Sequence, residues 1–333
     1  MAYVPFPEEA MIDDDWQLID LITGYQPAAA ITTAHRLGVF SVLGRAPRSA
    51  GDLAAELAVD PSNLAALLDA LVGIGLLERD GDRFAATPYT AERLGPGGEM
   101  GLVVAKEAVF AGAWSSLDDV VTAGRPVMEP WRSQLDRNPE QARAFLDALD
   151  VLARIGGPPL HELGELAPGK RVLDVGGGLG TYARLLSAAG SHVTLVDYPL
   201  VAGWASAELD GTGVEVVGVD LFEHPSCGVP PGSMDAALVS HLVHDLTEDQ
   251  AVELLRRVRS AIAPGSHVVV NDFAGDTGPG AFGALFDVMM RVETGGAAHS
   301  RKTLESMLAG AAFERIRRLP YDDPLTVYIG VRP

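Results

Sequence analysis

One glycine-rich segment, which runs from Arg171 to Leu186, constrains the fold of this chain more than any other feature. An apolar run ends there in the acid Asp174, four glycines follow between positions 176 and 180, and a helical pattern begins after them. Roughly 20 residues further on, a second apolar run ends in Asp197, which is the spacing of a nucleotide-binding β-α-β unit. The alternative is a glycine-rich turn in another kind of α/β domain, and the two acids in register argue against it. The segment therefore predicts a doubly wound α/β domain that binds a nucleoside.

The spacing of the acid and the glycines distinguishes between nucleoside cofactors. Enzymes that bind dinucleotides use G-x-G-x-x-G to bring the pyrophosphate against a helix N-terminus. Here Asp174 stands two residues before Gly176, and Gly178 and Gly180 follow at every second position. A carboxylate at this place would repel pyrophosphate, but it suits a cationic amino-acid ligand. This pattern resembles the first motif of S-adenosylmethionine (SAM) methyltransferases.

The resemblance continues along the chain and covers essentially all of it. The segment 219–222 looks like the part of that fold that contacts adenine. Residues 240–249 are similar to the HDW-D segment of the caffeate-type, or family-2, small-molecule O-methyltransferases, although Leu246 replaces the usual Trp. The Gly295-Gly296 pair and the last strands also match. The resemblance implies SAM as cofactor, and it assigns to the cofactor site Asp174, Gly176, Gly178, Asp197, Asp220, Leu221 and Ser240.

Composition limits the class of partner. The 333 residues, 47% of them hydrophobic, suffice for two domains with their own cores. Acids outnumber bases 45 to 25, and the net charge of −20 repels nucleic acids and anionic membranes, which favours a small-molecule substrate. The single cysteine, Cys227, fits a reducing compartment. Because there is no leader pattern and no apolar stretch of ~20 residues, we expect a soluble, cytoplasmic protein.

The first 100 residues predict a winged-helix arrangement. Helical periodicity runs from Trp16 to Leu43, a capped short helix follows Ser49, and another helix starts at Asp60-Pro61. Residues 77–84 predict a hairpin with an Asp-Gly turn. The expected recognition helix carries almost no basic residues, so DNA binding is disfavoured. In the resembled family this region is a dimerisation domain whose helices also wall the partner's active site, which implies a homodimer.

The pattern of residues 101–333 predicts a helical connector followed by a catalytic domain. Residues 101–158 are helical in pattern and are expected to line the active site, and residues 159–333 form the SAM-binding domain. Strands and helices alternate there, which predicts a mostly parallel, Rossmann-like sheet with ligands outside the carboxyl ends of its strands. The expected strands are 171–175, 192–196, 214–218, 234–239, 266–271, 313–319 and 325–331.

Three polar residues are expected at the carboxyl ends of these strands or in the loops beyond them: His244, Asp272 and His299. The fourth and fifth strands should be neighbours, about 4.8 Å apart, so His244 and Asp272 are expected to meet. In the resembled O-methyltransferases, the residue matching His244 is the general base that deprotonates a phenol, and an acid matching Asp272 orients it. A second acid belongs to that family's G-G-x-E-R pattern, but Ala298 occupies its position here and His299 follows.

The loss of this acid and the new histidine support a metal hypothesis. His244, Asp272 and His299 supply two imidazoles and one carboxylate, a set that suits non-haem iron or zinc. Several bacterial α-keto acid C-methyltransferases of this fold use metal held at the places matching His244 and His299. We therefore predict β-C-methylation of an α-keto acid, phenylpyruvate-like or branched, through a metal-chelated enolate. The alternative is a metal-independent O-methyltransferase of secondary metabolism that acts on a phenol, with His244 as base and His299 as a surface loop residue.

Overall fold

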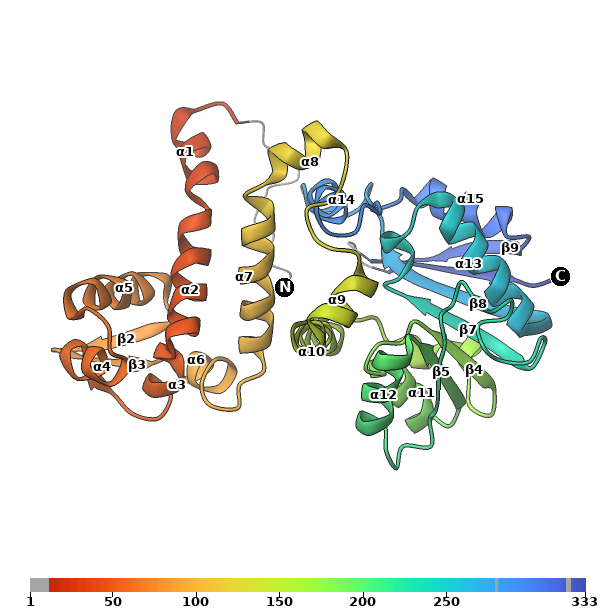
Figure 1. The fold of residues 1–333 in the computed structure, drawn as a ribbon, viewed down its shortest axis with the longest axis horizontal. Coiled ribbons are helices and arrows are strands. Elements are labelled where there is room, and N and C mark those ends of the chain that lie inside the picture. The colour runs from red at the N-terminus through yellow and green to blue at the C-terminus, as the bar shows by residue number, and fades with distance from the viewer. Residues whose placement is uncertain (1–11, 279–280, 322–324) are drawn as a thin grey trace. The chain divides into compact units, whose positions relative to one another are not determined.

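The computed structural model describes residues 12–278, 281–321 and 325–333, and these fall into two compact units (Figure 1). The N-terminal unit holds the described residues from 12 to 112 together with Asp147–Leu152. The sheet unit holds Ala113–Leu146 and Ala153–Pro333. The residues expected to form a separate connector, 101–158, are therefore shared between the two units.

The N-terminal unit contains a helical bundle and a small antiparallel sheet of order β1-β3-β2. The sheet pairs the short strand β1 with the second strand of the predicted hairpin. The elements of the unit are α1 (Asp15–Thr23), α2 (Tyr25–Leu37), α3 (Val39–Leu43), β1 (Arg48–Ser49), α4 (Ala50–Leu57), α5 (Pro61–Ile74), β2 (Leu77–Asp80), β3 (Arg83–Ala86), α6 (Pro88–Arg93) and most of α7 (Met100–Trp114).

Local signals in the sequence account for the ends of these elements. The Ser49 side chain accepts a hydrogen bond from the backbone N–H of Asp52 at 3.1 Å, and it thereby caps α4. The predicted hairpin is present, but its turn lies one residue further on. Asp80 pairs with Arg83, so the two-residue loop is Gly81-Asp82, with Gly81 at φ +60°. A glycine with positive φ in the first loop position is the arrangement that a II′ hairpin requires.

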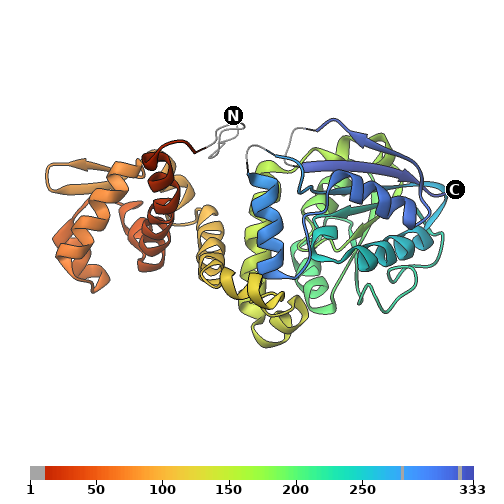
Figure 2. The ribbon, with the colours of Figure 1, turned by 90° about the horizontal axis from the view of Figure 1, so that it is seen from above.

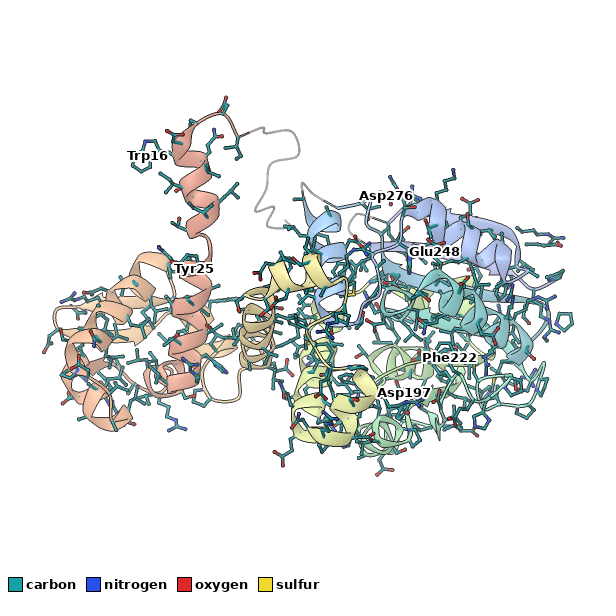
Figure 3. All side chains as sticks on the ribbon, turned by 45° about the horizontal axis from the view of Figure 1, so that its top comes forward. Trp16, Tyr25, Asp197, Phe222, Glu248 and Asp276 are labelled. Atoms are coloured by element: carbon teal, nitrogen blue, oxygen red, sulfur yellow. The ribbon has the colours of Figure 1, made fainter. Side chains whose placement is uncertain are left out.

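The apolar pattern of the first helices correctly predicts that they are helical, but the core face that it indicates for α1 is not buried. In α5, Leu64, Leu68 and Leu71 are buried, as their spacing indicates. In α1 no residue is buried within the described chain. Trp16 is 75% exposed and Ile22 63% exposed, and Figure 3 shows Trp16 projecting from this helix. The apolar surface of α1 is thus not covered by any described part of the chain.

The sheet unit has seven strands in the order β6-β5-β4-β7-β8-β10-β9. β4, β5, β6, β7 and β8 pair in parallel, and β10 lies antiparallel between β8 and β9. The strands are β4 (Arg171–Val175), β5 (His192–Asp197), β6 (Glu215–Gly218), β7 (Met234–Ser240), β8 (Ile262–Phe273), β9 (Glu314–Leu319) and β10 (Leu325–Val331). All seven predicted strands are confirmed, because short apolar runs between glycines and helical patterns mark buried parallel strands.

Helices cover both faces of this sheet (Figure 2). One apolar cluster packs the sheet against α13 and α15, and the other packs it against α11 and α12. The helices of the unit are α8 (Leu117–Ala123), α9 (Trp131–Arg137), α10 (Pro139–Gly156, of which the middle belongs to the N-terminal unit), α11 (Thr181–Ala188), α12 (Pro199–Glu208), α13 (Glu248–Ala261), α14 (Phe282–Glu293) and α15 (Arg301–Gly310). The doubly wound, Rossmann-like α/β fold is confirmed.

In the described ranges, no single helix has the length and apolar character to cross a membrane, and only α4 and α5 together, across a 116° bend, satisfy that criterion.

Candidate active site

The glycine-rich turn joins β4 to α11 at the carboxyl edge of the sheet. Gly176 and Gly178 have φ values of +66° and +56°, the left-handed region that favours glycine. A Cβ at Gly176 would come within 2.8 Å of the Leu242 side chain. The Gly178 N–H donates to the Asp197 carboxylate at 2.8 Å, which ties the turn to the end of β5. The turn therefore presents bare backbone beside the two acids that the sequence places there.

Asp174 and Asp197 are two carboxylates held close together in a poorly hydrated place. Asp174 is 2% exposed, and its Oδ2 has no hydrogen-bond partner among the described residues. Burial, and then the charge of Asp197, raises the pKa of Asp174 to about 7. Burial also raises the pKa of Asp197 to about 6, against the opposing effect of N–H donors from Gly178 and Tyr198. An unpaired buried carboxylate is a strong acceptor for a cationic group, so Asp174 fits the ammonium of an amino-acid ligand.

The other predicted cofactor residues lie at the same edge of the sheet. Asp220 and Leu221 follow β6, where the Asp220 carboxylate accepts a hydrogen bond from the Phe222 N–H at 2.9 Å. Leu221 packs against the apolar cluster beneath. Ser240 ends β7, and its Oγ accepts a hydrogen bond from Asn271 at 2.9 Å. The structure thus brings all the predicted cofactor residues to the ends of four neighbouring strands.

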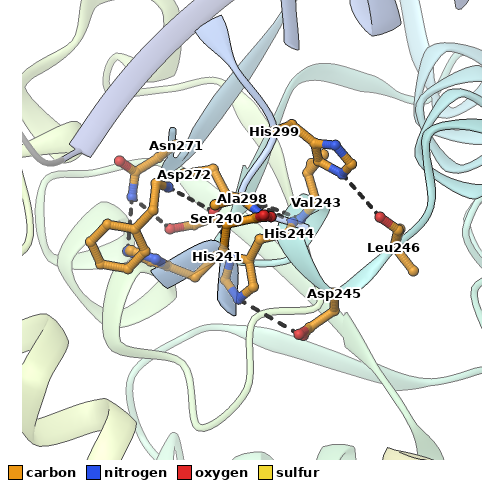
Figure 4. A network of polar contacts seen from close by, with 12 residues as sticks. Ser240, His241, Val243, His244, Asp245, Leu246, Asn271, Asp272, Ala298 and His299 are labelled. Atoms are coloured by element: carbon orange, nitrogen blue, oxygen red, sulfur yellow. Dashed lines mark hydrogen bonds and ion pairs between the residues drawn. The ribbon is translucent and has the colours of Figure 1, made fainter. Parts of the chain in front are cut away.

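His244 and Asp272 meet, as expected from strand adjacency (Figure 4). His244 lies in a short 3-10 helix, Val243–Asp245, after β7, and Asp272 lies near the end of β8. The Nδ1 of His244 is 2.5 Å from Asp272 Oδ1, which also accepts the Phe273 N–H at 2.8 Å. Asp272 Oδ2 accepts the N–H groups of Val243 and His244 at 2.9 and 3.2 Å. The carboxylate therefore fixes both the ring and the backbone of His244.

The charges around His244 set its protonation. Burial disfavours the imidazolium, but the charges of Asp272 and Asp245 and the Asp272 hydrogen bond outweigh it, and they raise the pKa of His244 to about 9. The His244 Nε2 is 3.7 Å from Asp245 Oδ1. Burial opposes ionisation of Asp272, but the neighbouring His244 holds the pKa of Asp272 below its ordinary value. With Nδ1 bonded to Asp272, Nε2 is the atom left to exchange a proton with a ligand.

The predicted metal ligand set does not assemble. His299 is 6% exposed, so it is not a surface residue, but its ring Nε2 lies 2.9 Å from the Leu246 carbonyl oxygen. If Nε2 donates to this carbonyl, only Nδ1 of His299 keeps a lone pair, so the position of the ring decides whether it can join the predicted set. Among the described residues, the group whose ligand atoms lie within 4.8 Å of one another consists of His241, His244 and Asp272, without His299.

Asp272 is also unsuited to an ion. Its two oxygens already accept four hydrogen bonds, one of them from His244 Nδ1. The donor set therefore does not fit the predicted iron or zinc, and Asp272 is an orienting carboxylate in this arrangement. The His299 ring is bonded to a carbonyl 53 residues away, a contact that the local sequence does not specify.

Two further residues of the network had only weak signals in the sequence. His241 has a φ of +52°, and its ring Nε2 is 3.3 Å from the Asn271 side-chain nitrogen. Burial, and then the neighbouring His244, lowers the pKa of His241 to about 4, with Asp272 opposing, so this imidazole is neutral. Asn271 is fully buried at the end of the apolar run Val268–Val270. A lone amide in such an apolar run is the signal in the sequence that could have indicated the role of Asn271.

Comparison with known proteins agrees with this geometry. Residues 114–314, well over half of the chain, match the family described as O-methyltransferase domain. Residues 19–95 match the O-methyltransferase dimerisation domain.

Individual relatives align along nearly the whole chain. The mitomycin biosynthesis 6-O-methyltransferase of Streptomyces lavendulae is 30% identical over 90% of this chain and 89% of its own length. The O-demethylpuromycin-O-methyltransferase of Streptomyces alboniger is 28% identical over 97% of this chain and 90% of its own length. The fold matches that of human N-acetylserotonin methyltransferase in complex with SAM, with a TM-score of 0.84 and 20% identity over 97% of this chain and 99% of that one.

These names favour oxygen as the methyl acceptor over the predicted carbon of an α-keto acid. The chain belongs to the O-methyltransferase family, and it is a SAM-dependent methyltransferase with the dimerisation domain of that family.

Proposed function

We propose that this enzyme methylates a phenolic hydroxyl of an aromatic small molecule of secondary metabolism, with His244 as general base. The observation that carries the proposal is the bond between His244 Nδ1 and Asp272 Oδ1, which leaves Nε2 as the proton acceptor. A single well-oriented imidazole suffices for this chemistry, because loss of the proton converts a weakly nucleophilic phenol into a good nucleophile, and the neutral fraction of the His244 imidazole grows as the pH rises towards 9.

Bound SAM supplies a methyl group on a positively charged sulfur. In the proposed reaction the phenol donates its O–H to His244 Nε2, and the imidazole takes the proton as the oxygen forms its bond to the methyl carbon. The carbon–sulfur bond breaks, and its electron pair stays on the sulfur of the demethylated product. Asp272 stabilises the imidazolium by a charge-assisted hydrogen bond, and solvent later removes the proton.

The proposed cofactor contacts all come from residues at the strand ends. We assign the ammonium group to Asp174, the ribose hydroxyls to Asp197, and the adenine end to Asp220 and Leu221. Gly176 and Gly178 let the backbone approach the ligand, and Ser240 flanks it from β7. The unpartnered Oδ2 of Asp174 is the strongest support for this placement.

The walls beside His244 suit a planar aromatic acceptor. The Phe286 ring lies 5.2 Å from the His244 ring at 79°, and Phe273 and Phe286 are 4.5 Å apart. Phe282 stacks on Phe286 at 6.2 Å. Such rings prefer offset or edge contacts with another aromatic ring. An anionic keto acid, in contrast, would face the carboxylates of Asp245 and Glu293, both of which raise the pKa of His244.

We further propose a homodimer formed through the N-terminal unit. The apolar side chains of α1 are exposed in the single chain, and α1 overlaps the region that matches the dimerisation family. Sedimentation of the Trp16→Glu/Ile22→Glu variant tests this proposal. A shift to the mass of one chain supports it, and an unchanged mass contradicts it.

The reaction is tested with SAM that carries a ¹³C-labelled methyl group and a panel of phenols and α-keto acids. Carbon NMR of the product distinguishes a methyl ether from a C-methyl group. The expected result is a methyl ether from phenols, with its formation lost in His244→Ala. A C-methyl product from phenylpyruvate would overturn the proposal and restore the keto acid interpretation.

A further inference from the structure

We propose that Arg132 closes the nucleoside end of the cofactor site, and that its ion pair with Asp220 slows the departure of the demethylated cofactor. The proposal rests on the placement of the nucleoside over Asp197 and Asp220 given above. Arg132 belongs to none of the motifs that the sequence analysis used.

The side chain of Arg132 reaches across the loops that follow two neighbouring strands. β5 and β6 pair in parallel, with Asp197 opposite Gly218, so the loops after them lie side by side. The Arg132 Nη2 pairs with Asp220 Oδ2 in the loop after β6. Its guanidinium carbon is also 5.1 Å from the ring centroid of Tyr198, the residue after Asp197. One cation thus links the two loops between which ribose and adenine are expected to lie.

Arg132 lies on α9, and α9 and the following helix, α10, are anchored beside this site. Leu135 of α9, Ala142 of α10 and Val201 of α12 form one buried apolar cluster. Trp131, Leu146, Tyr198 and Trp204 pack against that cluster. Leu146 also reaches the glycine turn, because its Cδ2 would lie 4.0 Å from a Cβ placed on Gly178. The helix pair therefore lies against the glycine turn as well as the loop after β5, and Arg132 is held where it can span the opening.

The exposure of the two partners shows that one of them is largely solvated. The Asp220 side chain is 11% exposed, whereas that of Arg132 is 56% exposed. Asp220 is fixed by its hydrogen bond from the Phe222 N–H, so Arg132 is the partner that moves. Ion pairs with one solvated partner are modest in strength and are weakened by salt. The contact is therefore strong enough to slow a ligand, and it is weak enough to release it.

The test is the rate of dissociation of S-adenosylhomocysteine, measured by surface plasmon resonance on immobilised full-length enzyme. In Arg132→Gln we expect this rate to rise roughly two- to fivefold, the effect of losing one partly exposed ion pair. Added salt should speed dissociation from the wild type and have little effect on the variant. The matched control is Arg143→Gln on α10, because Arg143 pairs with Glu208 and lies over Trp204 on the same face of α12.

Each outcome decides a separate point. The proposal is supported if S-adenosylhomocysteine dissociates faster from Arg132→Gln, independently of salt, and dissociates from Arg143→Gln at the wild-type rate. Wild-type dissociation kinetics in Arg132→Gln, or equal acceleration in both variants, overturns it. If the wild type does not bind S-adenosylhomocysteine at all, then the assigned cofactor site itself is wrong, and the role of Arg132 falls with it.

Discussion

Replacing Asp272 by Asn tests the electrostatics of the active site directly. The carboxylate accepts four hydrogen bonds, and two of them, from His244 Nδ1 and the Phe273 N–H, fall on one oxygen. An amide offers one acceptor oxygen and one NH₂ group, which is a donor. Whichever way the amide is turned, two of the four donors would then face its NH₂ group and lose their acceptor. The substitution also removes the negative charge that, with Asp245, outweighs burial at His244.

The structure sets the size of the effect. The rise in the pKa of His244 from 6.5 to about 9 corresponds to about 3 kcal/mol in favour of the buried imidazolium. Loss of one opposite charge at this distance lowers such a pKa by about 1 to 3 units. Because the folded-state pKa of His244 is raised, its contribution to stability is complete below pH 6.5 and is lost as the pH rises through 9. Asp272→Asn should therefore destabilise the enzyme most at low pH.

Two measurements follow from this reasoning. In the wild type, log kcat/KM should rise with pH up to about 9, as His244 loses its proton. In Asp272→Asn this rise should end at a pH about 1 to 3 units lower, because the pKa of His244 falls by that amount. The maximal rate should fall by about 100-fold or more, because the ring is no longer oriented. Asp276→Asn serves as the control. The Asp276 carboxylate also accepts a hydrogen bond from a backbone N–H, but the donor is Arg301 and not a residue beside the His244 ring. An acid limb that stays in place in Asp272→Asn would refute the reasoning.

Further predictions concern the cofactor site, the core and His299. Gly176→Ala should destabilise the fold by about 1–2 kcal/mol, since φ is +66° there, and should weaken S-adenosylhomocysteine binding, as seen by thermal unfolding and calorimetry. Binding of S-adenosylhomocysteine at pH 6 should release a proton, because its ammonium lowers the raised pKa of Asp174; calorimetry in buffers of different ionisation enthalpy would show no such release if Asp174 is already ionised. Leu68→Ala should cost about 2–5 kcal/mol in urea unfolding, since Leu68 is fully buried, and a smaller loss would contradict the packing of α5. His299→Ala should change turnover severalfold at most, because its Nε2 is bonded to a backbone carbonyl; a loss as large as that of His244→Ala would contradict the site described here.

Much of the fold and part of the site could be predicted because their signals are local. The strand ending in Asp174 and the glycines after it follow from a short segment, and so does the strand ending in Asp197. Once the strand order of a doubly wound sheet is assumed, the meeting of His244 with Asp272 follows from adjacency alone.

The features of the site that could not be predicted depend on contacts between segments far apart in the sequence. The bond from His299 to the Leu246 carbonyl fixes a loop whose path no local pattern specifies, so the metal hypothesis rested on residue types without their orientation. The ion pair of Arg132 with Asp220 likewise joins a helix to a loop far along the chain. The apolar side of α1 reads as a core face, but it is exposed in the single chain.

The central claim is that His244, with no metal, removes the proton from an oxygen acceptor. Single-turnover methyl transfer to a phenol acceptor, measured for enzyme treated with a chelator and for His244→Ala, tests it most directly. We predict an unchanged rate for the chelated wild type and a loss of at least about 100-fold in His244→Ala. A chelated wild type that is inactive and recovers with added iron or zinc would contradict the account.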